Sequence, residues 1–351
     1  MPDEGRGLVD RVWYGDDAVA SISRAILTPA ERVFRGVVGA RDILYDAGWL
    51  PTHDTPIPAL SIGNLTVGGS GKTPVAAWIA RGLLARGLKP AMVLRGYGAD
   101  EPLVHQQLNP GVPVVTNADR VAAVAEASRQ GAEVAVLDDA FQHRRVRRIA
   151  DLVLVSADQW TPEIHLLPAG PWREPLKAIR RATLVVVTRK AVDEKVVEAV
   201  HQRLSQTAPS IPRVSVRFDL GELTDGQDRA TTQPISRLAG ATVRAVLSIG
   251  NPGAFIRQLE QIGARVRPAI FSDHHNFSEA EVAKIASEHD GIDWFVCTLK
   301  DAVKLGPRWP RLAPSLWYVS QHVMVERGVG GIERLLDDVV RARQQTPSTA
   351  G

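Results

Sequence analysis

The feature that constrains this chain most is a glycine-rich segment between an apolar run and a helix-like segment. Residues 58–73 read Pro-Ala-Leu-Ser-Ile-Gly-Asn-Leu-Thr-Val-Gly-Gly-Ser-Gly-Lys-Thr. The apolar run at 59–62 predicts a buried strand, and apolar residues at helical spacing follow Thr73. Glycines let backbone N–H groups turn toward an anion, and a helix N-terminus adds unpaired donors and partial positive charge. The order of these parts is typical of a phosphate-binding loop.

The residues of this loop predict nucleotide binding. Lys72 can reach β- and γ-phosphates, and the Thr73 hydroxyl can bind Mg²⁺. Thr66 stands where the usual pattern has its first glycine, so Gly68 and Gly69 are expected to supply the flexibility. A glycine-rich turn beside a surface lysine is the alternative, which the flanking strand and helix disfavour. The predicted nucleotide contacts are Thr66, Gly68, Gly69, Ser70, Gly71, Lys72 and Thr73.

Composition limits the class of protein. The chain has 351 residues, 44% of them hydrophobic and 23% charged, which is typical of soluble globular proteins and long enough for two domains. A formal net charge of only +3 argues against a nucleic-acid partner. The single cysteine, Cys297, excludes an internal disulfide. Because there is no run of eighteen apolar residues and no signal peptide at 1–4, we expect the cytoplasm or a membrane face exposed to it.

Downstream of residue 58, apolar runs alternate with helix-like segments. Candidate strands lie at 60–62, 91–94, 112–115, 134–137, 152–155 and 184–187, and candidate helices at 74–86, 119–129 and 192–206. Strands that are apolar along their whole length are buried on both faces, as in a parallel sheet covered by helices. We therefore predict an α/β fold with a mostly parallel sheet of the P-loop NTPase type.

A second α/β block follows a polar, turn-rich stretch at 221–233. We place a kinase-like nucleotide-binding domain at 1–220, a linker at 221–240 and a smaller α/β domain at 241–335. The candidate strands of the smaller domain are 243–249, 267–271, 294–297 and 316–319, and its candidate helices are 252–261 and 278–288. A closing helix is expected at 333–343. The small, polar residues 344–351 are expected to be disordered.

The N-terminal segment has two interpretations. Residues 16–45 look helical, with a break near Pro29, and apolar residues recur at helical spacing in the second half. Residues 20–41 carry a net charge of +3, which suits a helix lying on an anionic membrane surface. A helix that packs against its own domain is equally compatible with the pattern.

Two carboxylates and a basic run follow the candidate strand at 134–137. In phosphate-loop enzymes an acid at the place of Asp138 or Asp139 holds Mg²⁺, and adjacent side chains on a strand point to opposite faces. A pair of solvated turn acids is the alternative. His143 and four arginines at 144–148 come next, either as a solvated loop or as a clamp for an anionic substrate.

Further polar residues follow other candidate strands, where α/β proteins bind ligands. Asp100 and Glu101 are both candidates for a general base that accepts a proton from a hydroxyl nucleophile. Residues 166–175 form a proline-flanked loop with Arg173 and Glu174, which alone is a weak signal.

The second block offers its own candidates. Asn251 lies in a turn after a strand, and Lys300 could contact a phosphate or an acid. Asp273 and two histidines, His274 and His275, form a short cluster. Adjacent histidines without a cysteine or glutamate cluster do not suit zinc, so an Asp–His pair that orients a base, or a turn with surface histidines, are the interpretations.

Taken together, these motifs resemble the tetraacyldisaccharide 4′-kinase (lipid A 4′-kinase) family. The matching segments are 61–74, 95–98, 100–102, 138–143, 167–175, 250–252, 273–275 and 298–304. The Asp-Asp-x-Phe-Gln-His and Leu-Pro-Ala-Gly-x-x-Arg-Glu-Pro runs are far more particular than the phosphate loop. The resemblance implies transfer of the γ-phosphate of ATP to the 4′-hydroxyl of an acylated glucosamine disaccharide 1-phosphate.

The resemblance also implies roles for individual residues. Lys72 and Thr73 would bind ATP and Mg²⁺, and Asp138 and Asp139 would hold the metal. Asp100 would be the general base, tuned by His274. His143, Arg173, Glu174 and Asn251 would contact the acceptor or line the active site. The family's N-terminal helix binds the inner-membrane surface, so we expect a peripheral protein on its cytoplasmic face with no obligate protein partner.

Several positions depart from the family's pattern. Asp100 follows Gly98 almost at once, where the family carries a longer insertion, and Ala99, Ala140 and Leu299 replace common residues. These changes bear on the identity of the acceptor more than on ATP binding. Two alternatives therefore stay open: a nucleotide-switch ATPase that acts on a protein partner, and a kinase for a soluble acceptor. The sequence does not predict acyl-chain preference, oligomeric state or depth of membrane contact.

Overall fold

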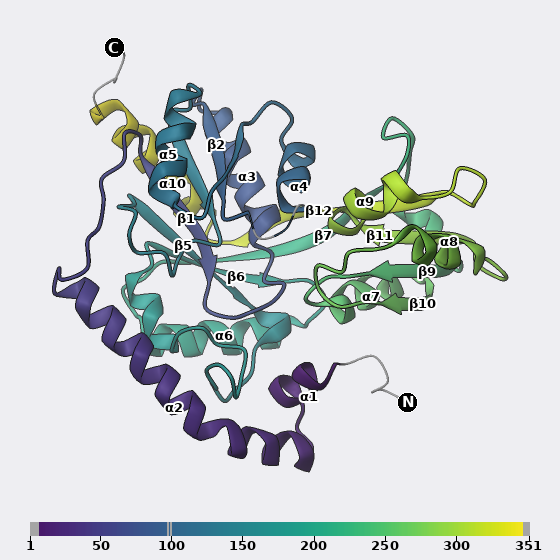
Figure 1. Ribbon diagram of the computed structural model, residues 1–351, viewed down its shortest axis with the longest axis horizontal. Coiled ribbons are helices and arrows are strands. Elements are labelled where there is room, and N and C mark those ends of the chain that lie inside the picture. Colours follow the sequence, from purple (N-terminus) through teal and green to yellow (C-terminus); the bar gives the residue numbers. More distant parts are fainter. Residues whose placement is uncertain (1–6, 97, 99, 347–351) are drawn as a thin grey trace.

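A computed structural model describes residues 7–96, 98 and 100–346 of the chain. Within these residues twelve strands form one sheet, with eleven in the order β10-β9-β11-β12-β7-β6-β5-β1-β4-β2-β3 and β8 paired with β7 (Figure 1). The strands are β1 (Ala59–Asn64), β2 (Pro90–Leu94), β3 (Val114–Thr116), β4 (Val134–Asp138), β5 (Ala150–Ser156), β6 (Leu184–Arg189), β7 (Arg213–Asp225), β8 (Thr232–Gln233), β9 (Thr242–Leu247), β10 (Arg265–Ile270), β11 (Trp294–Thr298) and β12 (Leu316–Arg327).

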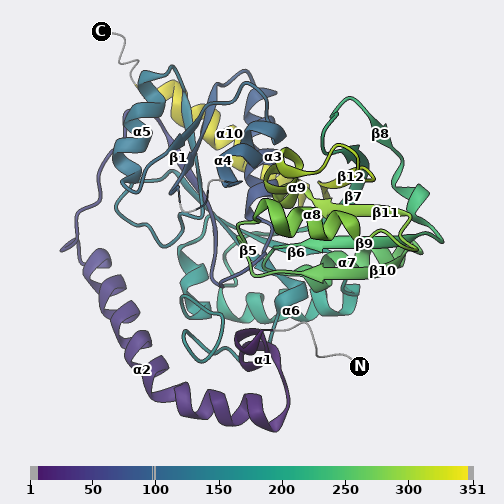
Figure 2. The ribbon, with the colours of Figure 1, turned by 45° about the vertical axis from the view of Figure 1, so that its right-hand side comes forward.

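Helices precede the sheet and cover it on both faces (Figures 1 and 2). The α-helices are α1 (Leu8–Tyr14), α2 (Ala18–Asp46), α3 (Lys72–Leu84), α4 (Asp100–Leu108), α5 (Arg120–Arg129), α6 (Glu194–Thr207), α7 (Pro252–Gln261), α8 (Glu279–Ser287), α9 (Leu299–Leu305) and α10 (Val329–Gln345). Short 3₁₀ turns are η1 (Ala157–Gln159), η2 (Leu176–Arg181), η3 (Ile235–Leu238) and η4 (Gly306–Arg308). None of the helices in the described part of the chain has the length and apolarity needed to span a membrane.

The first part of the sheet is buried on both faces, as the continuous apolar strands predict. Alternate residues of one strand point to opposite faces, so Leu60 and Ile62 pack with α3 and α10, whereas Ala59 packs with α5. Strands β3, β2, β4, β1, β5, β6 and β7 pair in parallel throughout this part. The α/β class and the mostly parallel sheet are therefore confirmed.

The smaller part of the sheet repeats this arrangement. Strands β10, β9, β11 and β12 are parallel to one another. Phe255 and Leu259 of α7 pack on one face, and Val282 of α8 and Ala302 of α9 pack on the other. The division into two domains stays a prediction, because both parts belong to one continuous sheet.

The predicted linker at 221–240 needs correction. Residues 221–225 are the end of the thirteen-residue strand β7, and β8 and η3 lie within the rest. Strand β7 pairs antiparallel with the twelve-residue strand β12, which makes this the seam between the two parts. The polar composition of 221–225 suggested a linker. These residues form a strand nevertheless, because their backbone N–H and C=O groups are hydrogen-bonded to β12.

The predicted helix break at Pro29 is also wrong. Helix α2 runs through Pro29 along a curved path (Figure 1). Proline removes the hydrogen bond to the carbonyl four residues earlier, here Ala25. Both residues are exposed, so water can satisfy that carbonyl.

Two other local predictions differ from the structure. Residues 100–108, which are not among the predicted helices, form helix α4, and the closing helix α10 extends to Gln345. Most of the tail that was expected to be disordered, 347–351, lies outside the described residues.

Candidate active site

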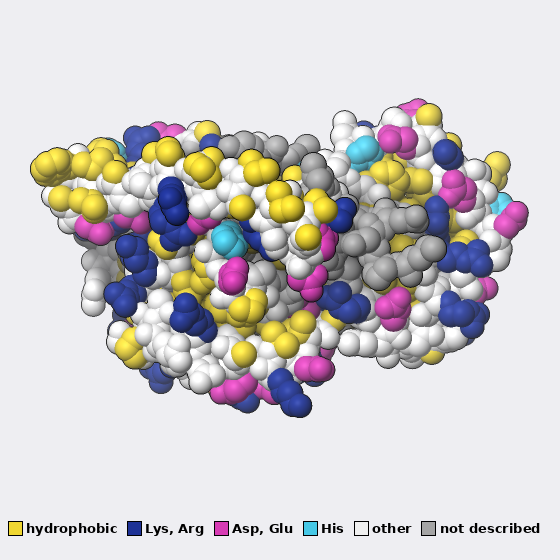
Figure 3. Space-filling model, turned by 90° about the horizontal axis from the view of Figure 1, so that it is seen from below, with side chains coloured by type: hydrophobic (Ala, Val, Ile, Leu, Met, Phe, Trp, Pro, Cys, Tyr) yellow, Lys and Arg dark blue, Asp and Glu magenta, His cyan; other side chains and the backbone are white. Residues whose placement is uncertain are grey.

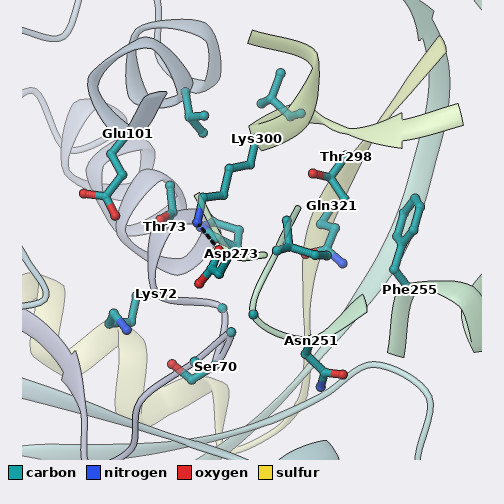
Figure 4. Close-up of a pocket in the computed structure, with 18 of the residues that line it drawn as sticks. Ser70, Lys72, Thr73, Glu101, Asn251, Phe255, Asp273, Thr298, Lys300 and Gln321 are labelled. Carbon is teal, nitrogen blue, oxygen red and sulfur yellow. Dashed lines mark hydrogen bonds and ion pairs between the residues drawn. The ribbon is translucent and has the colours of Figure 1, made fainter. Parts of the chain in front are cut away.

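A cavity of about 390 Å³ lies where the two parts of the sheet meet. The phosphate loop, the start of α4 and the loop after β6 line it from the larger part. The ends of β9, β10 and β11 with their following loops line it from the smaller part. Figure 4 shows Ser70, Lys72 and Thr73 below and beside Asp273 and Lys300, with Asn251 and Phe255 opposite. The carboxyl ends of parallel strands meet here, as expected for a ligand site in an α/β protein.

The phosphate loop has the strained backbone that its glycines permit. Gly71 has φ +87°, and a Cβ there would lie 2.3 Å from Cζ of Phe218. The Asn64 amide donates to the Ser70 hydroxyl at 2.8 Å and accepts from Lys72 Nζ at 3.2 Å. Helix α3 begins at Lys72, so its first N–H groups open toward the cavity. The loop is therefore shaped to bind phosphate through backbone amides and one ammonium group.

Asp138, at the end of β4, lies beside the start of α3. The Thr73 hydroxyl donates to Asp138 Oδ2 at 3.4 Å, and Nε2 of His105 lies 2.9 Å from the same oxygen. Asp138 is only 4% exposed, and within the described part of the chain its Oδ1 accepts no hydrogen bond. A buried carboxylate oxygen without a partner beside a threonine hydroxyl suits a hydrated Mg²⁺, which takes oxygen ligands and keeps several waters.

Asp139 points to a different set of partners. Its backbone has φ +49°, and its carboxylate accepts two hydrogen bonds from Nη1 of Arg173 at 2.9 and 3.0 Å. Lys72 Nζ is 3.6 Å away. Burial raises the pKa of Asp139, but Lys72 and Arg173 outweigh it and hold the pKa below its ordinary value. The neighbouring acids thus have separate environments, because β4 ends at Asp138 and the positive φ of Asp139 turns its side chain away from the strand direction.

Asp100, which is buried beside the cavity, contacts His274, which lines it. His274 Nδ1 lies 3.3 Å from Asp100 Oδ1, and its Nε2 lies 3.0 Å from Lys300 Nζ. Burial raises the pKa of Asp100, but the hydrogen bond with His274 and nearby lysines leave it below its ordinary value. The same hydrogen bond raises the pKa of His274. Such a carboxylate is ionised at neutral pH and can accept a proton.

Glu101, the other candidate base, has a different environment. It lines the cavity, and burial followed by the charge of Asp138 raises its pKa. Lys300 also donates to Asp273 at 3.0 Å (Figure 4), so β10 and β11 contribute one polar network. His274 has φ +58°, a backbone conformation that aims its ring at Asp100.

The smaller part also touches the phosphate loop directly. A Cβ on Gly69 would lie 3.4 Å from the backbone nitrogen of Asn251, so the loop and the start of α7 approach closely. The Asn251 side chain caps α7 by accepting from Ala254 N at 3.2 Å. Asn251 and Phe255 both line the cavity (Figure 4).

Among the described residues, five predicted site residues do not line the cavity: Thr66, Asp100, Asp138, His143 and Glu174. Asp100 and Asp138 are buried, but they contact the lining residues His274 and Thr73. Glu174 is fully buried, and its two oxygens pair with Arg41 of α2 and Arg181 of η2, so the prediction that it lines the site is wrong. Its charge instead ties α2 to the body of the protein.

Sequence reasoning missed two residues at the site. His105 follows Asp100 by five positions on α4, a helix that the sequence analysis did not predict, so its approach to Asp138 could not be predicted. Lys190, just after β6, donates to the carbonyl of Gly69 at 3.4 Å and lines the cavity. Burial lowers the pKa of Lys190. Lys190 directly follows an apolar candidate strand, and this position was the sequence pattern that could have indicated a second lysine, besides Lys72, at the site.

The fold and this site define a P-loop phosphotransferase, in which a phosphate loop lines a cavity and an ionised carboxylate, Asp100, lies buried beside it. A family model described as tetraacyldisaccharide-1-P 4′-kinase matches residues 23–341. The chain belongs to this family.

Curated relatives and a solved structure agree with this assignment. A tetraacyldisaccharide 4′-kinase of Anaeromyxobacter sp. (strain Fw109-5) is 36% identical over 98% of this chain and 100% of its own length. One of Nitrosococcus oceani is 31% identical over 92% of both chains. The crystal structure of LpxK from Aquifex aeolicus in complex with ATP is similar with a TM-score of 0.69 and 27% identity, covering 91% of this chain and 99% of that one.

Proposed function

We propose that this kinase transfers the γ-phosphate of ATP to the 4′-hydroxyl of a tetraacyl glucosamine disaccharide 1-phosphate, in lipid A biosynthesis. The observation that carries the proposal is the ionised Asp100, held by His274 beside the cavity that the phosphate loop lines. A phosphate donor and a hydroxyl acceptor can meet between them. Family membership supports the acceptor's identity.

The larger part of the protein would bind ATP. Backbone amides of the loop and Lys72 would hold the β- and γ-phosphates, and Lys190 would add a second cation beside Gly69. Thr73 and Asp138 have the oxygen atoms to hold Mg²⁺ together with phosphate oxygens. When bound, Mg²⁺ neutralises charge that develops on the phosphates during transfer.

Asp100 would act as the general base. The acceptor's hydroxyl oxygen attacks the γ-phosphorus, its proton passes to Asp100, and the bond to the β-phosphate oxygen breaks to release ADP. Both carboxylate oxygens of Asp100 lie 3.3 Å from Nδ1 of His274, so the imidazole can stay on one oxygen while the other takes the proton. His274 holds the carboxylate in the ionised form through the hydrogen bond to Oδ1.

Other polar groups would position the two substrates. Arg173, fixed by its two hydrogen bonds to Asp139, presents a guanidinium at the cavity wall that can pair with a phosphate or sugar oxygen. Asn251 and Lys300 reach the same cavity from the smaller part. Because the base Asp100 and its partner His274 belong to different parts of the sheet, closure of the two parts on the substrates would complete the site.

Helix α2 would place the active site at the membrane. Its exposed apolar side chains recur three, four or seven residues apart along one stripe, and Figure 3 shows hydrophobic side chains gathered along this helix. The stripe consists of Val19, Ile22, Ile26, Val33 and Val37. Arg32 and Arg35 are also exposed and suit anionic headgroups. We propose peripheral binding to the cytoplasmic face of the inner membrane, where ATP and a lipid acceptor are both accessible.

The decisive experiment follows label from [γ-³²P]ATP into lipid. We expect label on the tetraacyl disaccharide 1-phosphate with the parent protein and a loss of roughly 10²-fold or more with Asp100→Asn, as for removal of a general base. ATP binding should survive in this variant and be lost in Lys72→Ala. A Lys72→Ala protein that binds ATP as tightly as the parent would remove the phosphate-loop assignment.

The two alternatives give different outcomes in the same assay. A nucleotide switch would hydrolyse ATP without acceptor and respond to a protein partner. A kinase for a soluble acceptor would label a water-soluble sugar without detergent or membrane. Either result would contradict the lipid acceptor while leaving the ATP site intact.

A further inference from the structure

His105 is the buried polar group closest to the proposed metal carboxylate. It is 0% exposed, and Nε2 lies 2.9 Å from Oδ2 of Asp138. Within the described residues its Nδ1 has no hydrogen-bond partner. Burying an imidazole away from water costs free energy that an apolar side chain of similar size would not cost. The hydrogen bond with Asp138 is therefore the interaction that offsets the burial of His105.

Helix α4 directs His105 at the metal site. Residues four apart share one face of a helix, so His105 lies one turn below Glu101, which lines the cavity. Burial and, after it, the charge of Asp138 raise the pKa of Glu101, which agrees with this face of α4 looking toward Asp138. The same helix begins at Asp100. One element thus carries the proposed base at its first residue and a contact to the metal carboxylate one and a half turns later.

The contact also decides which oxygen of Asp138 is free. An ionised carboxylate only accepts, so the imidazole donates its Nε2–H to Oδ2. The Thr73 hydroxyl donates to the same Oδ2 at 3.4 Å, whereas Oδ1 accepts no hydrogen bond from any described residue. With Oδ2 occupied twice, the carboxylate is prevented from rotating, and Oδ1 is kept for the hydrated cation.

We propose that His105 is a positioning residue that orients Asp138 for Mg²⁺ and thereby fixes the distance between the metal site and Asp100. The proposal rests on the Mg²⁺ site of the proposed function. Hydrogen-bond partners of metal-binding groups typically change metal affinity ten- to hundredfold when removed.

The test compares variants at His105 with a matched variant on the same segment. His105→Phe fills the volume without a donor, and His105→Gln keeps an N–H donor that can reach the carboxylate. Asn109→Leu is the control, because it removes another buried hydrogen bond of this segment, from Asn109 Nδ2 to the carbonyl of Ala77 at 2.9 Å, without touching Asp138. ATP binding is titrated by calorimetry in EDTA and at increasing Mg²⁺.

We expect His105→Phe to raise the Mg²⁺ concentration for half-maximal enhancement of ATP binding roughly tenfold or more, with ATP affinity in EDTA unchanged. His105→Gln should return it to within about threefold of the parent value, and Asn109→Leu should leave it unchanged. Half-maximal Mg²⁺ in His105→Phe equal to that of the parent would overturn the proposal. So would an equal rise in Asn109→Leu.

Two further arrangements keep the test decisive. If His105→Phe does not fold, His105→Asn replaces it, because the shorter asparagine amide does not reach Asp138. We expect His105→Asn to need more Mg²⁺ for half-maximal enhancement of ATP binding, as a protein without the donor would. A Mg²⁺ dependence equal to that of the parent would refute the role of His105. Because the readout is Mg²⁺-dependent ATP binding, failure to phosphorylate a lipid would count against the proposed function and not against His105.

Discussion

Asp100, the first residue of α4, and His274, in the loop after β10, meet with Oδ1 and Nδ1 3.3 Å apart. They are 174 positions apart in the chain and belong to different parts of the sheet. Each stabilises the charged form of the other: the pKa of Asp100 is lowered despite burial, and that of His274 is raised. A proton acceptor that stays ionised is thus assembled only when both parts of the protein are in place.

Removing the imidazole should shift the pH dependence of catalysis. In His274→Gln the carboxylate of Asp100 loses an ion-pair partner while its burial remains, so its pKa rises. We expect the acid limb of the kcat/KM profile to move to higher pH and kcat to fall about tenfold to a thousandfold. The measurement is the initial rate of lipid phosphorylation between pH 5 and 9.

His275→Gln is the matched control for this change. The neighbouring ring points away and lies 3.1 Å from Glu281 instead. Its variant should keep the parent profile. An unshifted acid limb in His274→Gln would show that Asp100 is not tuned by this residue.

His143 should make the protein less stable in mild acid. Burial, followed by the charges of Arg120 and Arg148, lowers its pKa to about 4. As pH falls from 6.5 toward 4, the unfolded chain takes up a proton here and the folded chain does not, so stability is lost through that window. Urea unfolding at pH 7 and pH 5 should show a smaller loss for His143→Gln than for the parent. Equal losses would mean that His143 is not buried in its neutral form.

The Arg41–Glu174 pair should hold helix α2 against the protein. Arg41→Ala leaves the fully buried carboxylate of Glu174 with Arg181 as its remaining ion-pair partner among the described residues, and breaking a buried ion pair costs about 3–5 kcal/mol. We expect a lower urea midpoint and faster proteolysis within α2. Arg32→Ala, on an exposed position of the same helix, should change stability by less than about 0.5 kcal/mol. The idea fails if both variants unfold at the same urea concentration.

The apolar stripe of α2 should determine membrane binding. Ile26 and Val33 are 72% and 69% exposed. Ile26→Asp with Val33→Asp removes apolar area and adds charge at the interface, so we expect sedimentation with anionic phospholipid vesicles to fall at least roughly tenfold. ATP binding should be unaffected. Leu312→Asp, at a fully exposed apolar position far along the chain, is the control. If it weakens sedimentation as much, α2 is not the membrane contact.

Much of the site was predictable because its parts are local. The phosphate loop at residues 58–73 depends on a strand, glycines that permit positive φ, and a helix start, all within sixteen residues. Asp138 was predicted beside it because it ends an apolar strand. Glu174 was misplaced for the opposite reason: its partners, Arg41 and Arg181, come from other elements, and no local pattern reveals that both of its oxygens are already occupied.

The sequence by itself determined the class of fold, the position of the phosphate loop and the family resemblance, because short-range sterics and hydrophobic periodicity act on neighbouring residues. Only the tertiary structure decided that 221–225 complete a strand, that His105 contacts Asp138 and that His274 reaches Asp100. Those outcomes depend on the pairing of β7 with β12 and on how α4 packs between the two parts. Such contacts are set by the shape and burial of surfaces that distant segments create together, and no stretch of sequence contains them alone.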